Sequence, residues 1–158
     1  MVTCTKEIND FCLRLLARRE HSRKELLTKC LAKGYSKEDS LAVIDGLAGQ
    51  GWQDDLRYAQ SYARHLIQRG YGPVFIRYQL HQKGVDTVDL DGIVETVAGS
   101  WMDALEQVYT KKYKHGASDN RIDRQESAKR SRFLMQRGFP AAMISALFGH
   151  LNSNNPKF

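Results

Sequence analysis

The fold is decided by three copies of one short pattern, Lys33-Gly34-Tyr35, Lys83-Gly84-Val85 and Arg137-Gly138-Phe139, in which a glycine separates a cation from an apolar residue. The glycines recur at steps of 50 and 54 residues. Steps of this size are typical of tandem helical units, each too small to bury its apolar face alone. A cation followed by glycine also suits the end of a helix, because glycine readily adopts the left-handed conformation and the cation faces the negative end of the helix dipole.

The residues after each glycine repeat a helical spacing. The positions 6, 9, 10 and 13 residues downstream are mostly apolar: Ser40, Val43, Ile44 and Leu47, then Leu90, Ile93, Val94 and Val97, then Ile144, Leu147, Phe148 and Leu151. This spacing places all four positions on one face of an α-helix, and no stretch of the chain alternates apolar with polar residues as a strand does. The sequence therefore predicts an all-α fold.

Turn residues divide the chain into about nine helices, three in each repeat. We expect repeats at 1–50, 51–98 and 99–152 that stack into one elongated, curved body, followed by a frayed tail at 153–158. The third repeat is the loosest match, because Arg130 stands where the others have leucine and isoleucine. The residues expected to form the structural repeat motif are Gly34, Gly84, Gly138, Trp52, Asp54, Gly72 and Pro73.

Several polar residues have the spacing of helix caps. Ser22 is followed three residues later by Glu25, which predicts a capping box. Asp86 stands where the first repeat has its serine cap, so we expect it to start the corresponding helix. The pair Asp54 and Asp55 resembles a metal or acid/base site, but its place after a tryptophan and before an apolar helix favours an N-cap.

The net charge of +6 is concentrated in one segment. Residues 111–137 contain nine Lys or Arg against three Asp or Glu, whereas residues 1–110 contain 14 against 15. Such asymmetry predicts an anionic partner for the C-terminal third, either nucleic acid or an acidic protein face. The alternative is a solvated helix face without a partner. The candidate binding cations are Lys111, Lys112, Lys114, Arg121, Arg124, Lys129, Arg130, Arg132 and Arg137.

Aromatic residues alternate with the first of these cations. Tyr109 and Tyr113 lie four residues apart among the lysines, as on a surface that tracks single-stranded nucleic acid. The alternative interpretation is that both tyrosines belong to the core. With so many cations, binding to a polyanion is expected to be weak in sequence preference and sensitive to salt.

A second set of cations precedes the glycines of the first two repeats. We predict a secondary basic face from Arg23, Lys24, Lys29, Lys33, Arg77 and Lys83. The helices that follow these glycines carry several acidic residues, which would repel the phosphates of a DNA groove in a helix-turn-helix arrangement. A regulator that acts on duplex DNA is therefore the alternative hypothesis and not the preferred one.

No pattern indicates catalysis, a metal or a cofactor. The five histidines are scattered and form no zinc or nucleophile motif, and an uncharacterised enzyme is the third hypothesis. The three cysteines are widely spaced, which argues against both a disulfide framework and a zinc site, so we expect buried thiols. No apolar run is long enough to cross a membrane and no signal-peptide core precedes the first helix, so a cytoplasmic protein is expected.

Four stretches together resemble the bacterial RecX family of RecA regulators. They are residues 15–22 (LLARREHS), 51–59 (GWQDDLRYA), 69–76 (RGYGPVFI) with Lys83-Gly84-Val85, and 132–139 (RFLMQRGF). Each stretch alone is ordinary helix punctuation, but the combination is specific and covers nearly the whole chain.

The resemblance implies a fold of tandem three-helix units and a non-enzymatic function. Members modulate the RecA recombinase on single-stranded DNA, and are thought to lie along the groove of the nucleoprotein filament and to reduce strand exchange, ATP hydrolysis and coprotease activity. We accordingly expect a monomer that binds the RecA filament, with salt-sensitive contacts to the single-stranded DNA inside it.

Overall fold

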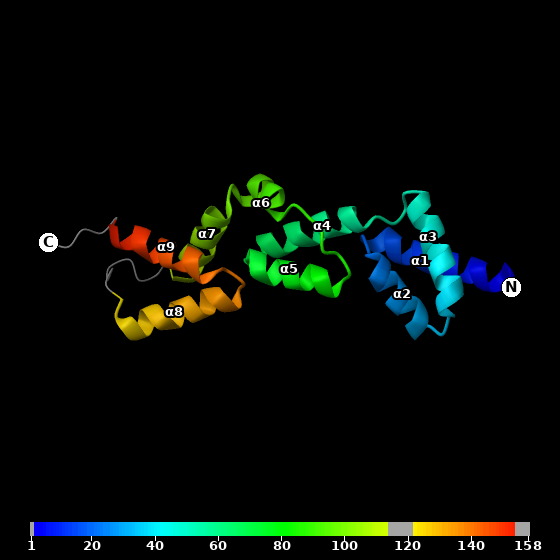
Figure 1. Ribbon diagram of the computed structural model, residues 1–158, viewed down its shortest axis with the longest axis horizontal. Helices are drawn as coiled ribbons and strands as arrows, with labels where there is room; N and C mark the ends of the chain where they lie inside the picture. The colour runs from blue at the N-terminus through cyan, green and yellow to red at the C-terminus, as the bar shows by residue number, and fades with distance from the viewer. Residues whose placement is uncertain (1, 114–121, 154–158) are drawn as a thin grey trace. The chain divides into compact units, whose positions relative to one another are not determined.

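The protein is all-helical in the computed structural model, which describes residues 2–113 and 122–153. These residues form nine α-helices and no strand, as the sequence predicts (Figure 1). The helices are α1 (Val2–Arg18), α2 (Arg23–Ala32), α3 (Lys37–Gly49), α4 (Asp55–Gln68), α5 (Pro73–Gln82), α6 (Leu90–Ala98), α7 (Trp101–Tyr113), α8 (Arg124–Gln136) and α9 (Ala141–Ser153). Ser153 ends α9, so the rest of the predicted tail lies outside the described residues.

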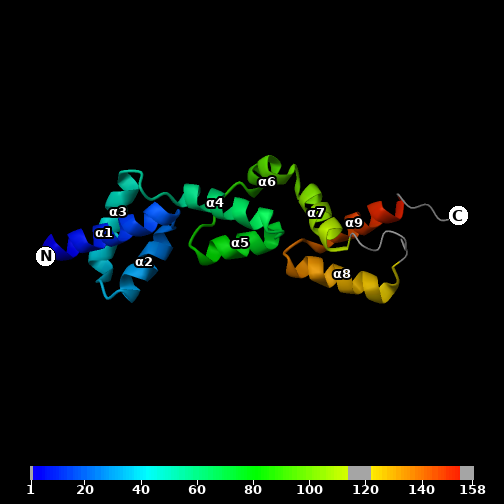
Figure 2. The ribbon, with the colours of Figure 1, turned by 180° about the vertical axis from the view of Figure 1, so that it is seen from behind.

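The chain divides into two compact units, residues 1–62 with 80–88 and residues 63–79 with 89–158. In the first unit α3 packs against both α1 and α2, as Figure 1 and the reverse view in Figure 2 show. Their shared core consists of Ile8, Cys12, Leu26, Cys30, Val43, Ile44 and Leu47. Cys12 and Cys30 are buried free thiols with their sulfur atoms 3.6 Å apart. The apolar face predicted after Gly34 is thus the centre of the first bundle.

In the second unit α7 contacts α6 and α9, and α9 also contacts α8. The predicted apolar faces of α6 and α9 are buried at Leu90, Ile93, Val94, Ile144 and Leu147. Leu105 from α7 and Leu134 from α8 are fully buried too, so each helix from α6 to α9 contributes buried apolar side chains to this unit.

The helix ends follow the predicted chemistry with one exception. Ser22 and Glu25 form a capping box, and Asp54 accepts hydrogen bonds from the Leu56 and Arg57 N–H groups (2.9 and 3.1 Å). The expectation for Asp86 is wrong, because α6 begins only after Asp89, whose side chain accepts from the Gly92 N–H. The intervening Thr87 and Val88 are β-branched and disfavour helix, and Asp86 pairs instead with His81.

The three repeat glycines have positive φ, with Gly34 and Gly138 at 99° and Gly84 at 82°. The N–H of the residue after each glycine donates to a carbonyl in the last turn of the preceding helix: Cys30 (3.1 Å), Leu80 (2.9 Å) and Leu134 (3.2 Å). This is the Schellman arrangement that the cation-glycine-apolar pattern predicts.

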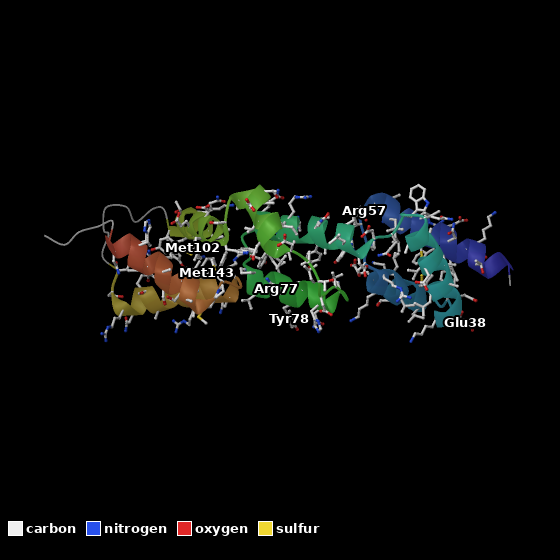
Figure 3. The ribbon with its side chains drawn as sticks, turned by 45° about the horizontal axis from the view of Figure 1, so that its top comes forward. Glu38, Arg57, Arg77, Tyr78, Met102 and Met143 are labelled. Atoms are coloured by element: carbon white, nitrogen blue, oxygen red, sulfur yellow. The ribbon has the colours of Figure 1, made fainter. Side chains whose placement is uncertain are left out.

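The backbone closes the turn before α4, whereas the ring of Trp52 stays 59% exposed. The Trp52 N–H donates to the Leu47 carbonyl (2.9 Å). Arg57, labelled in Figure 3, donates to the carbonyls of Trp52 (3.2 Å) and Gly51 (2.9 Å) and pairs with Glu20 (3.0 Å). The Trp52 backbone therefore takes part in this turn through both its N–H and its carbonyl, and Arg57 ties the turn to Glu20.

The turn before α5 interlocks with the turn after α8. The Gly72 N–H donates to the Arg137 carbonyl (2.7 Å), and the Val74 N–H donates to the Gly138 carbonyl (2.9 Å). A Cβ atom on Gly72 would lie 2.6 Å from the Gly138 oxygen, and one on Gly138 would lie 2.6 Å from the Phe75 backbone nitrogen. Glycine is required at both positions because the two backbones approach this closely.

Candidate nucleic-acid interface

The nine predicted binding cations separate into four groups in the structure. Lys114 and Arg121 lie outside the described residues. Arg130 points into the protein, whereas Lys111, Lys112 and Arg137 line a common pocket. The third group within the described ranges lies exposed on α8, namely Arg124, Lys129 and Arg132. The cations of the basic segment therefore lie in different environments and do not form one uniform face.

Arg130 joins α8 to α7 and is only 16% exposed. It donates from Nη1 to the Tyr109 hydroxyl (2.7 Å) and from Nε to Glu126 (2.9 Å). Its guanidinium also lies 4.2 Å from the ring centre of Tyr113. Burial acts against the charged form, but the hydrogen bonds to Glu126 and Tyr109 outweigh it and raise the pKa of Arg130. This arginine replaces an apolar residue of the repeat by packing its planar group between aromatic rings.

Tyr109 and Tyr113 belong to the same cluster and are not a stacking surface for bases. Their rings lie 5.1 Å apart, and Phe148 and Phe133 contact them edge-on at 5.8 and 6.1 Å. Both tyrosines are half-buried and packed against other rings, which favours the core interpretation over a surface that stacks bases. Aromatic pairs of this kind contribute roughly 0.5–1.5 kcal/mol beyond their buried area.

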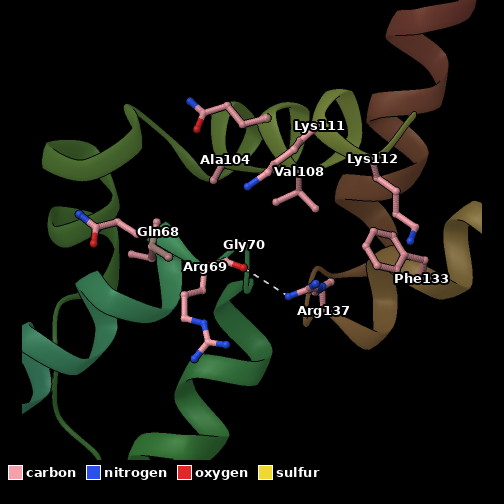
Figure 4. Close-up of a pocket in the computed structure, with 11 residues that line it drawn as sticks. Gln68, Arg69, Gly70, Ala104, Val108, Lys111, Lys112, Phe133 and Arg137 are labelled. Carbon is pink, nitrogen blue, oxygen red and sulfur yellow. Dashed lines mark hydrogen bonds between the residues drawn. The ribbon is translucent and has the colours of Figure 1, made fainter. Parts of the chain in front are cut away.

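A pocket of about 440 Å³ opens between the end of α4, α7 and the end of α8 (Figure 4). Its cationic residues are Lys111 and Lys112 in the last turn of α7, Arg137 directly after α8, and Arg69 directly after α4. The residues that line it are Ile67, Gln68, Arg69, Gly70, Ala104, Gln107, Val108, Lys111, Lys112, Phe133 and Arg137. None of these described lining residues is acidic, so the pocket concentrates positive charge above an apolar floor.

Arg137 is held in place at one side of this pocket. Its Nη1 donates to the Arg69 carbonyl (3.3 Å), the bond drawn in Figure 4. Its guanidinium lies 4.8 Å from the ring centre of Tyr71, which itself stacks on Phe75 at 4.2 Å. Because the interlocked glycine turns bring Arg69 to Arg137, residues from two repeats build the site. Sequence reasoning treated Arg69 only as part of a turn, since no local signal links it to Arg137.

The other two pocket lysines differ in how they are held. Lys112 places its Nζ 4.4 Å from the ring centre of Phe133, a cation–π contact. Lys111 is exposed, and Figure 4 shows its side chain extending over the pocket near Val108. Across the described ranges, no ion pair involves Lys111, Lys112 or Arg137, so their charges remain available to an anion.

The predicted secondary basic face is partly neutralised within the first unit. Arg23 pairs with Asp45 (2.9 Å), and Lys83 lies 3.7 Å from Glu25. Lys33 lies 5.8 Å from the ring centre of Phe11. Lys24, Lys29 and Arg77 are exposed, and Figure 3 labels Arg77 on α5. Cations that already have acidic partners gain less from binding phosphate, so this face is the weaker candidate.

Two other classes of site have no support among the described residues. No group of three or more His, Cys, Asp or Glu side chains in those ranges is arranged to hold a metal ion. None of the described helices combines the length and apolar character that crossing a membrane requires. Asp55, considered above as part of a metal pair, accepts instead from the Arg23 N–H (2.8 Å) and from Gln53 (2.8 Å).

Comparison with known families assigns all three helical units. Residues 10–47, 54–91 and 102–148 match the first, second and third three-helix domains of RecX. The protein named "Regulatory protein RecX" of Xanthomonas oryzae pv. oryzae (strain MAFF 311018) is 37% identical over 134 residues, 85% of this chain and 82% of its own. Its namesake from Pseudomonas syringae pv. tomato is 35% identical over 133 residues, 84% of each chain.

Solved structures show the same fold. The crystal structure of RecX from Lactobacillus salivarius superposes with a TM-score of 0.75 at 19% identity, over 97% of this chain and 99% of that one. A second crystal structure, of a regulatory protein RecX, gives a TM-score of 0.72 at 22% identity, over 90% and 70% of the two chains. Since three matching domains, close relatives and a shared fold agree over nearly the whole sequence, the chain belongs to the RecX family of regulatory proteins.

Proposed function

We propose that this protein binds the RecA nucleoprotein filament and reduces RecA's recombinase, ATPase and coprotease activities without being an enzyme itself. The observation that carries the proposal is membership of the RecX family through all three domains. The name of the relatives, "Regulatory protein RecX", describes a regulator and no catalytic activity.

The cations of the second unit support a role at a nucleoprotein surface. Lys111, Lys112 and Arg137 face a pocket, and Lys129 and Arg132 lie exposed on α8. Such a surface attracts the phosphates of the DNA held by RecA, in an association that weakens with salt.

The direct test is RecA's DNA-dependent ATPase, measured against increasing amounts of this protein. We expect inhibition at less than one molecule per RecA, because tandem repeats that span several RecA subunits block more than one of them. Co-sedimentation with the filament, in the presence and absence of nucleotide, verifies binding in the same samples. Full ATPase activity at equimolar protein, with binding verified, contradicts the proposal.

The alternative of a regulator that acts on duplex DNA gains no support from a particular observation. Glu38 and Asp39 occupy the first turn of α3, and Asp91 that of α6, where a helix in the major groove would approach phosphates. Competition between single-stranded and duplex oligonucleotides of equal length distinguishes the two functions, since the alternative requires preference for the duplex.

A further inference from the structure

The pocket between α4, α7 and α8 has the properties of a built anion site. Four cations line it: Lys111 and Lys112 from the last turn of α7, Arg137 from the end of α8, and Arg69 from the end of α4, whose guanidinium extends away from the two lysines (Figure 4). No described acidic side chain lines it, so no lining residue offsets the mutual repulsion of these cations before an anion binds. A concave wall with low-dielectric surroundings focuses that potential.

Arg137 is the fixed part of the site. The Arg69 carbonyl and the Tyr71 ring hold the guanidinium, so that little side-chain entropy is lost when a ligand binds. Only Nη1 is used in a hydrogen bond within the described ranges, which leaves the donors on Nε and Nη2 for a ligand. Lys112 is similarly restrained against Phe133, whereas the exposed Lys111 is free to close over a bound group.

The geometry points to a phosphate ester as the ligand: we propose that the pocket binds a phosphate group through Lys111, Lys112 and Arg137 and receives the attached sugar or base on its apolar floor. Three donors from different directions suit the tetrahedral oxygens of phosphate better than a planar carboxylate. The floor includes Ile67 and Val108, and Gln68 and Gln107 supply amide groups. A pocket of about 440 Å³ has room for a nucleotide unit.

Base stacking on Phe133 does not explain the pocket. Lys112 lies 4.4 Å and Arg137 5.4 Å from the ring centre, and the Tyr113 ring approaches edge-on. With its surroundings occupied by cations, the ring orients them for the phosphate. The site would therefore recognise charge and not base identity. It rests on the proposed function only for its biological ligand, the single strand held in the RecA filament.

The experiment follows the amide signals of Gly70 and Val108 by nitrogen–proton NMR, without RecA. The probes are pyrophosphate, a 12-residue oligothymidylate and a hexaglutamate peptide. We expect the first two to shift both signals saturably and to compete with each other, and the peptide to have little effect. A response to pyrophosphate alone would identify a site for free phosphate, and a response to the oligonucleotide alone would identify a site for the nucleic-acid backbone. In either case the ligand is a phosphate group, as proposed.

A matched pair of variants locates the effect. Lys111→Gln and Arg14→Gln each remove one exposed charge, but only Lys111 lines the pocket, and Arg14 belongs to neither predicted set of binding cations. We expect Lys111→Gln to weaken binding of the phosphate probes roughly three- to tenfold and Arg14→Gln less than twofold. Arg137 is left unchanged because it also supports the fold.

Equal losses of affinity in the two variants, unmoved Gly70 and Val108 signals, or tighter binding of the peptide than of either phosphate probe would each overturn the site. RecA is absent from these measurements, so such a failure leaves the regulatory proposal standing. Conversely, a saturable phosphate site together with normal RecA ATPase activity in the presence of this protein would refute the regulation and retain the pocket.

Discussion

At the scale of single residues, identical side chains in the basic segment have opposite roles. Arg130 is enclosed by Tyr109, Tyr113 and Glu126, whereas Arg132, two residues later, is exposed. A charge count treats the two arginines alike. The structure separates them because neighbouring positions on a helix point about 100° apart, so a step of two residues turns the side chain from α7 towards solvent.

Replacing Arg130 with alanine is expected to lower the free energy of unfolding by about 1–3 kcal/mol, because the Tyr109 hydroxyl and Glu126 are left without a charged hydrogen-bond partner. Arg132→Ala is the control, since it removes the same charge from an exposed position and should change stability by about 0.5 kcal/mol or less. Urea titration followed by circular dichroism measures both. Equal midpoints for the two variants would mean that the hydrogen bonds of Arg130 contribute nothing to stability.

Two buried groups of the first unit make its stability depend on pH. Burial lowers the pKa of His21 below its ordinary value of 6.5, against the hydrogen bond between its Nδ1 and the Arg19 carbonyl. Burial alone would raise the pKa of Glu25, but hydrogen bonds from Arg19 and Ser22 and the charges of Arg19 and Lys83 lower it overall. In both cases the unfolded chain binds protons more readily than the folded one.

Stability is therefore expected to be complete above pH 6.5 and to decrease as the pH falls from there towards the lowered pKa of His21, with a further decrease in the acid range as Glu25 is protonated. Urea unfolding at several pH values gives the slope. His21→Gln should reduce the slope below pH 6.5, and the same change at the exposed His65 is the control. A slope that survives in His21→Gln assigns the effect to another group.

At the scale of helices and turns, the repeat glycines all need a positive φ, but they differ in how much space surrounds them. Gly34 and Gly138 share a φ of 99°, but a Cβ atom meets nothing within 4 Å at Gly34 and overlaps the backbone of Phe75 at Gly138. The first glycine only ends a helix. Gly138 also leaves room for the turn at Gly72 to approach. The backbone hydrogen bonds between these two turns join the last two repeats and position Arg137.

Gly34→Ala and Gly138→Ala separate these two effects. Alanine at Gly34 should destabilise by about 1–2 kcal/mol through the positive φ alone. Alanine at Gly138 should cost about 1–3 kcal/mol more, because its Cβ overlaps the α5 backbone. Thermal and urea unfolding of both variants test the difference. Indistinguishable decreases in stability would show that the two turns can separate without cost.

At the scale of the whole molecule, the helices differ in how far acidic side chains offset their cations. In the first unit Arg23, Arg57 and Lys83 have acidic partners within 4 Å. Of the described cations on α7 and α8, only Arg130 has an ion-pair partner. The excess charge of residues 111–137 is thus mostly free to attract a polyanion, which a uniform distribution would not permit.

Reversing Lys129 and Arg132 together to Glu should weaken binding to single-stranded DNA and to the RecA filament. The slope of log affinity against log salt should fall by roughly 0.7 for each DNA phosphate that the variant no longer neutralises. Arg130 is retained so that the fold survives. The control reverses Arg14 and Lys37, two exposed cations of the first unit. Fluorescence anisotropy over a salt series measures both pairs, and equal changes would place the DNA-binding surface elsewhere.

The sequence by itself determined the helical class, the positions of the turns and the apolar face of each repeat. These follow from interactions three or four residues apart and from the conformations open to single residues, as at Ser22 and Gly84. They can be predicted from local sequence because the backbone hydrogen bonds of a helix form within the helix itself. The start of α6 was the exception, where the capping signal of Asp86 competed with β-branched neighbours.

Only the tertiary structure decided which cations are available to a ligand. Arg130 is occupied by residues of α7, and Arg137 meets Arg69 and Tyr71 from another repeat. The close approach of Gly72 to Gly138 that creates the pocket joins segments far apart in the chain. Periodicity and composition carry no information about such approaches, because they depend on how separate helices pack together and not on the neighbours of each residue along the sequence.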